Sequence, residues 1–304
     1  MAEMAKIVGG RPLEIVVATG LLLKLCMSCS PVIVTLSVIF NSVTRHAMCT
    51  VSLSAFATVV CWAASLPRTF KFVAQVGVIS TTSILMAVFI AIIGLGVAGH
   101  PNGTSADWAR EITVVGRPSF VAGVSACLKI CYAFAGNVAY ISYMAEMRNP
   151  SKDFAPALAV LQISSVLLYI VTTVPIYCLS GQFVRSPALG STPDLPARIA
   201  FGAALPAVLA TGLAFGHTAI KYMYLLVLQA LNATHRATEN SATPWSIWVS
   251  CATAFWLVCF LVANAILVFD SIISISSAIF VSWFAFGISG IFWYYRNWRE
   301  KLYP

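Results

Sequence analysis

The residues best suited to bind a ligand interrupt a long apolar run between positions 119 and 145. The middle of this run consists of Tyr132, Ala133, Phe134, Ala135, Gly136 and Asn137. Glycine permits unwound backbone, and backbone groups that leave a helix at bilayer depth must be paired or line a cavity. Two facing half-helix ends can hold the carboxylate and ammonium of a zwitterion. We therefore interpret these six residues as a candidate binding site, and the alternative is a small-residue face for helix packing.

The other reactive side chains form no catalytic or metal-binding pattern. The four histidines are scattered and most acidic residues fall between apolar runs, so no nucleophile, base and orienting group can be assembled. Cys26-x-x-Cys29 has the spacing of a metal motif, but no second cysteine pair or nearby histidine completes four ligands. Seven cysteines lie in apolar runs, where we expect packed thiols: Cys26, Cys29, Cys61, Cys127, Cys131, Cys251 and Cys259. The sequence predicts no enzymatic activity, no metal and no cofactor.

The composition is that of a membrane protein. Of the 304 residues, 60% are hydrophobic and 9% are charged, with a mean hydropathy of +0.88, whereas a soluble domain carries about 25% charged residues. Eight apolar stretches approach or exceed the roughly 20 residues that span a bilayer. They are 13–40, 48–66, 72–98, 119–145, 154–180, 201–231, 245–268 and 271–295. Runs of this length without alternation predict helices, not barrel strands, so we expect an all-α membrane protein with about eight transmembrane helices in one transmembrane domain, 1–304.

Basic residues in the short loops predict the orientation of these helices. One side of the predicted membrane collects ten of them: Lys6, Arg11, Arg68, Lys71, Arg148, Lys152, Arg236, Arg296, Arg299 and Lys301. The other side has five: Arg45, Arg110, Arg117, Arg185 and Arg198. The positive-inside rule places the first side, and both termini, in the cytoplasm. Asn102 begins a glycosylation acceptor on the other side.

No basic cluster with interleaved aromatics accompanies the net charge of +8, so nucleic acid is not an expected partner.

Several sequence segments resemble the fungal neutral amino acid permeases of the amino acid/auxin permease family. The most specific is AFAGN followed by AYISYMAEMRNPSKDF, at positions 133–154. Four further segments also look like family positions: NSVTRHAMCTV, FVRSPALGS, ALPAVLATGLAFGHTAIKYMYLLVL and YRNW. The resemblance covers essentially the whole chain.

This resemblance implies a fold and a function. The expected fold is a LeuT-type inverted-repeat bundle, with substrate held between the broken first and sixth helices. The expected function is transport of neutral amino acids, coupled to protons or to sodium, in a plasma or vacuolar membrane whose lipid bilayer surrounds the helices. Aligned by these segments, the chain begins before the family's third helix and stops after its tenth. We therefore keep an alternative: a non-transporting membrane subunit, an amino-acid sensor or an inactive truncated permease.

Ionisable residues near the predicted helices complete the candidate list. Lys221 follows His217 by one turn, and the resemblance places both in a helix that lines an ion site in this fold. A lysine there could replace a sodium ion or take part in proton coupling, and the alternative is a snorkelling lysine. Glu146, at a helix end, could form a gating ion pair or be solvated. We expect Lys24 to snorkel or to pair with Glu14.

Overall fold

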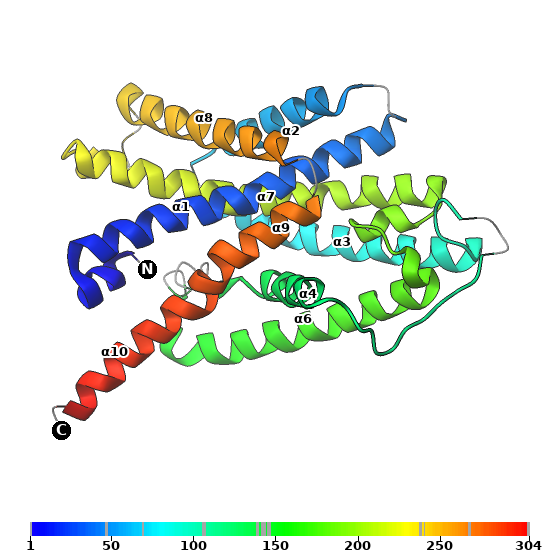
Figure 1. The fold of residues 1–304 in the computed structure, drawn as a ribbon. Coiled ribbons are helices and arrows are strands. Elements are labelled where there is room, and N and C mark those ends of the chain that lie inside the picture. Colours follow the sequence, from blue (N-terminus) through cyan, green and yellow to red (C-terminus); the bar gives the residue numbers. More distant parts are fainter. Residues whose placement is uncertain are drawn as a thin grey trace. The chain divides into compact units, whose positions relative to one another are not determined.

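The computed structural model consists of helices joined by turns and loops. It describes residues 2–45, 48–68, 70–104, 108–137, 140, 144, 147–236, 239, 241–266 and 269–302. Every regular element in these ranges is helical (Figure 1). The all-α membrane fold predicted from the composition is confirmed.

The helices follow one another in a simple order. The α-helices are α1 (Ala2–Val43), α2 (Thr50–Ala64), α3 (Phe70–Ala98), α4 (Phe120–Ala133), α6 (Pro150–Ser180), α7 (Asp194–Ala230), α8 (Ala242–Ala265), α9 (Phe269–Ser276) and α10 (Ile288–Leu302). A π-helix, η4 (Ser277–Gly287), connects α9 to α10. Three short 3-10 helices complete the described elements: η1 (Gly181–Phe183), η2 (Ala188–Ser191) and η3 (Thr234–Arg236).

Six helical segments in the described ranges are long and apolar enough to cross a bilayer. They are Met4–Val43, Val76–Ala98, Pro150–Phe183, Asp194–Ala230, Ala242–Ala265 and Phe269–Trp298. The apolar helices α2 and α4 are shorter, with 15 and 14 residues. At 1.5 Å per residue each reaches about 22 Å, less than the roughly 30 Å of hydrocarbon. The eight predicted stretches therefore correspond to six long helices and two short ones.

The first helix extends further toward the N-terminus than its apolar run. The residues before position 13 include charged and polar side chains and give no transmembrane pattern, so the predicted stretch begins only at position 13. The helix bends at Gly9 and Gly10, where Gly10 has φ 69° and ψ −164°. Only glycine adopts this backbone conformation readily. Ala5, before the bend, lies in one buried cluster with Val17, Phe284 and Ile288.

The chain forms two compact units. Unit 1 comprises Met1–Lys24, Val114–Val174 and Ile273–Pro304, and unit 2 comprises Leu25–Thr113 and Pro175–Ile272. Unit 1 therefore contains the start of α1, α4, most of α6, η4 and α10. Unit 2 contains the rest of α1, together with α2, α3, α7 and α8.

Small residues allow close helix packing inside unit 2. α3 runs beside α7 (Figure 1), and a Cβ added to Gly94 of α3 would lie 2.5 Å from Pro196. On α7, a Cβ at Gly216 would lie 2.7 Å from the ring of Trp256 in α8. Glycine at these positions lets the backbones approach, as is common between membrane helices.

Candidate functional site

The predicted interruption lies at the end of α4, in unit 1. This helix begins after Ser119, whose side chain accepts a hydrogen bond from the Ala122 N–H at 3.4 Å, and it ends at Ala133. Phe134 and Gly136 lie in turns, and helical backbone begins again at Asn137. The apolar stretch 119–145 is thus interrupted after Ala133, at the residues where the sequence predicts a break.

The backbone groups freed by the break are partly paired. The Ala135 N–H donates to the Tyr132 carbonyl at 3.2 Å. The Tyr169 hydroxyl, on α6, donates to the Ala133 carbonyl at 3.2 Å. The rings of Phe134 and Tyr169 also meet edge to face, with centroids 5.4 Å apart. Tyr169 of α6 therefore stabilises the break through one hydrogen bond and one ring contact.

Asn137 attaches the break to the π-helix. Its Nδ2 donates to the carbonyls of Ala285 at 2.7 Å and Phe284 at 3.3 Å. Both carbonyls belong to η4, so the amide joins the break to this helix. Asn137 Oδ1 is buried and accepts no hydrogen bond from any described residue. This oxygen is therefore a buried acceptor at the break.

A pocket of about 430 Å³ adjoins the break. Its lining residues are Ile130, Cys131, Phe134, Asn137, Tyr140, Gln162, Ala285 and Phe286. The volume is within the range of about 300–1,000 Å³ found for small-molecule sites. None of these eight side chains carries a charge, so the pocket suits a ligand without net charge.

Gln162 and Tyr140 are pocket residues that sequence reasoning missed. Gln162 Nε2 donates to the Tyr140 hydroxyl at 3.2 Å. Gln162 stands in the apolar stretch 154–180, and a polar side chain inside such a stretch is a signal that could have found it. Tyr140 lies three residues after the six that were selected.

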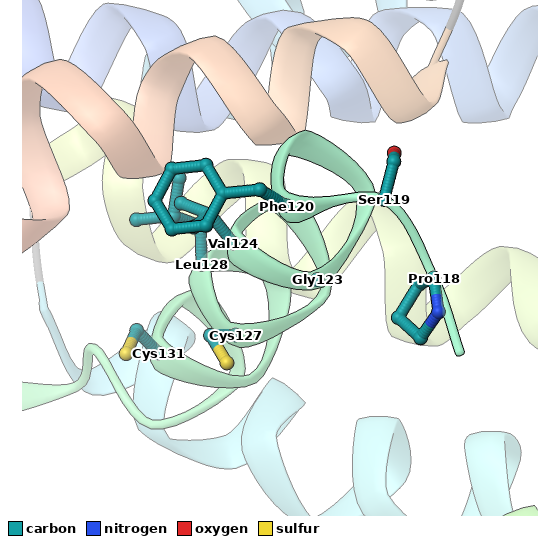
Figure 2. A pocket seen from close by; sticks show the side chains of 8 residues that line it. All are labelled: Pro118, Ser119, Phe120, Gly123, Val124, Cys127, Leu128 and Cys131. Carbon is teal, nitrogen blue, oxygen red and sulfur yellow. The ribbon is translucent and has the colours of Figure 1, made fainter. Parts of the chain in front are cut away.

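A second pocket, of about 360 Å³, runs along α4 (Figure 2). All its lining residues belong to α4 or to the two positions before it: Pro118, Ser119, Phe120, Gly123, Val124, Cys127, Leu128 and Cys131. It is a furrow on one helix face, and nothing in it converges on a ligand.

The predicted coupling residues lie elsewhere. His217 on α7, in unit 2, is 2% exposed, and its Nε2 is 3.1 Å from the Pro67 carbonyl oxygen. Lys221, one turn along α7, has an exposed side chain. Glu146 lies outside the described residues. In the described structure neither α7 residue lines the pocket at the break.

His217 belongs to a set of side chains that holds the segment after α2, which we call the 65–68 clamp. Trp256 Nε1 donates to the Ser65 hydroxyl at 3.2 Å, and Trp248 Nε1 donates to the Leu66 carbonyl at 3.1 Å. Arg68 donates to the Tyr224 hydroxyl at 2.8 Å. The Arg68 guanidinium also lies over the rings of Tyr224, Trp245 and Trp248, at 5.2, 5.6 and 5.9 Å from their centroids. Ser65, Leu66 and Arg68 are thus each bonded by a side chain of α7 or α8.

The expectation for Lys24 is wrong. Lys24 is 2% exposed and lies inside α1, far from either helix end, so its side chain cannot snorkel. Glu14 is ten residues away, about 15 Å along a helix, and pairs instead with Lys6 at 3.6 Å. A charged side chain this deep must be accommodated by protein.

The expectation of packed thiols holds for five of the seven cysteines. The buried ones are Cys26, Cys29, Cys61, Cys251 and Cys259. Cys26 and Cys259 have their sulfur atoms 3.5 Å apart. Cys127 is exposed and Cys131 is half-buried, and both line the second pocket on α4.

The fold and this site define a class: an all-helical, multi-pass membrane protein with an uncharged, ligand-sized pocket at an interrupted helix. The family follows from a sequence match. The model of the transmembrane amino acid transporter protein family matches residues 2–303, so the chain belongs to that family.

Curated relatives agree with this assignment. The chain is 27% identical over 293 residues to the N amino acid transport system protein of Neurospora crassa, covering 94% of this chain and 60% of that one. It is 23% identical over 304 residues to a transmembrane transporter of Fusarium pseudograminearum, covering 99% of this chain and 63% of that one. A transmembrane transporter of Gibberella moniliformis is 22% identical over 298 residues, covering 97% and 62%. The chain spans about six-tenths of the length of these relatives. No solved structure matches it.

Proposed function

We propose that this protein moves neutral amino acids across a membrane, coupled to protons, by alternating access. The observation that carries the proposal is the interrupted helix α4 beside an uncharged pocket. The family supplies amino acids as the substrate class, and the relative from Neurospora crassa is named as an amino acid transport protein.

The pocket chemistry supports neutral substrates. The α-ammonium and α-carboxylate of an amino acid can be held by backbone groups at the break. A charged substrate side chain would need a further partner of opposite charge, because burying an unpaired charge is costly. The described lining residues supply no such partner.

The division into two compact units supports alternating access. That mechanism moves one group of helices against another around a substrate site. The break, its supports on α6 and η4, and the pocket all belong to unit 1. We propose that they move together with bound substrate.

Proton coupling is assigned to His217, Lys221 and Glu146, with sodium as the alternative ion. His217 and Lys221 are ionisable and one turn apart on the long helix α7, and intramembrane ionisable residues commonly mark ion pathways.

We further propose that both termini are cytoplasmic, that Asn102 is glycosylated and that the protein resides in the plasma or vacuolar membrane.

Reconstitution tests the proposal directly. The 304-residue chain is purified, and binding of tritiated L-leucine and L-arginine is measured in nanodiscs. Uptake of the same amino acids is then measured in proteoliposomes with and without an imposed pH gradient. We expect saturable leucine binding, weak arginine binding and leucine uptake that rises with the gradient. Arginine bound as tightly as leucine would contradict neutral specificity, and leucine binding without uptake would favour the sensor or subunit alternative.

A further inference from the structure

We infer that Gln162 and Tyr140 form a subsite that recognises a carboxamide on the substrate side chain, so that glutamine and asparagine are preferred over apolar amino acids. This inference rests on the proposed function and deepens it. It concerns the pocket at the break in α4, which both residues line.

The two side chains are placed as a pair. Gln162 Nε2 is 3.2 Å from the Tyr140 hydroxyl oxygen. The Tyr140 ring meets Phe154 of α6 edge to face, with centroids 5.9 Å apart. The phenol is thus positioned by a ring contact as well as by the hydrogen bond, and both anchors come from α6.

The pair offers one donor and one acceptor at the same place. The Tyr140 oxygen accepts from Gln162, so its own O–H can donate to a ligand, while Gln162 Oε1 can accept. If the amide is turned round, Gln162 accepts from the phenol and its N–H groups face the ligand, and the phenol oxygen can still accept. Either arrangement complements a carboxamide, which itself carries a carbonyl acceptor and an N–H donor.

The position of Gln162 argues against a purely structural role. It lies twelve residues into the 31-residue helix α6, about 18 Å from the helix start and so near the middle of the span. A polar side chain at this depth usually faces a cavity or a polar partner. Gln162 does both, because it lines the pocket and bonds Tyr140.

The rest of the pocket suits the aliphatic part of such a substrate. Ile130, Phe134 and Phe286 supply apolar wall. An apolar substrate would fill the space but leave the donor and acceptor of the pair unsatisfied, and sites built to hydrogen-bond discriminate strongly against ligands that cannot.

The test compares two tritiated amino acids, L-glutamine and L-leucine, bound to the purified chain in nanodiscs. We expect wild type to bind glutamine more tightly than leucine. Q162L should lower glutamine affinity about tenfold relative to leucine, as expected for the loss of roughly one hydrogen bond. Y140F should shift the ratio in the same direction while keeping the ring contact with Phe154.

Y169F is the matched control. It removes a tyrosine hydroxyl that bonds the Ala133 carbonyl at the break and is not part of the pocket lining. It should weaken glutamine and leucine by the same factor. Equal losses for both ligands in Q162L and Y140F would overturn the subsite while leaving the proposed function standing. Binding of neither ligand by wild type would overturn both.

Discussion

Asn137 and Ala285 are joined by a hydrogen bond of 2.7 Å from the amide Nδ2 to the carbonyl oxygen, across 148 positions of sequence. The bond links the break in α4 to the π-helix η4, two irregular elements of unit 1. Asn137, the residue at which helical backbone begins again after the break, therefore also donates hydrogen bonds to two carbonyls of the π-helix.

Replacing Asn137 by alanine should destabilise unit 1. The change removes the hydrogen bonds to the Ala285 and Phe284 carbonyls, which costs about 0.5–1.5 kcal/mol for each bond. Thermal unfolding in detergent should show a lower Tm. S282A is the control, because Ser282 is half-buried and its hydroxyl donates to Ala278 within its own helix. Similar shifts for both variants would mean that the link is not stabilising.

Gly136 should tolerate alanine and reject leucine. A Cβ there would lie 3.8 Å from Tyr140 Cε1 and Oη, which is ordinary contact. A leucine side chain extends further toward Tyr140 and favours continuous helix over the turn. We expect G136A to bind leucine nearly as wild type does, and G136L to lose binding at normal membrane abundance. If abundance fell together with binding in G136L, the position would be one of packing.

Two glycines of α7 should respond in opposite ways to alanine. A Cβ at Gly216 would lie 2.7 Å from the buried ring of Trp256, so G216A should lower Tm. At Gly202 a Cβ would meet nothing within 4 Å. Since alanine is better than glycine in a helix by about 1 kcal/mol, G202A should leave Tm unchanged or raise it. Equal effects would contradict the close approach of α7 and α8.

The 65–68 clamp should loosen when Trp248 loses its N–H. W248F keeps an aromatic ring near Arg68 but removes the hydrogen bond to the Leu66 carbonyl. Amide hydrogen exchange at Ser65, Leu66 and Arg68 should become faster. W245F changes only a ring that lies over Arg68 in a more exposed position, and it should have a smaller effect. Unchanged exchange in W248F would show that the segment is held by its own backbone.

Glycosylation tests the orientation. Asn102 lies in a turn, partly exposed, and its backbone N–H donates to the Ser191 carbonyl at 2.8 Å. A second acceptor, Asn232-Ala233-Thr234, falls on the predicted cytoplasmic side. Endoglycosidase treatment should therefore shift the mobility of wild type and of N232Q but not of N102Q. A shift that disappears in N232Q would reverse the orientation.

Sequence reasoning found the regular helices and the break for clear physical reasons. Long apolar runs have few alternatives in a bilayer, and a glycine next to an amide at Gly136 and Asn137 is conspicuous inside such a run. It did not find the subsite, because the pairing of Gln162 with Tyr140 depends on how α6 folds back against the break. Nor did it find the π-helix, whose eleven residues are mostly apolar and carry no distinguishing pattern. The depth of Lys24 was misjudged because helix length beyond the apolar run was not visible in composition.

α6 carries the chain from one compact unit into the other at Val174 and Pro175, and the helix continues through this point to Ser180. Proline has no N–H, so the Val171 carbonyl lacks the donor that every ordinary turn of the helix provides. Helices bend most easily where this ladder is interrupted. Pro175, the first residue of unit 2 on α6, is therefore a position at which this helix can bend.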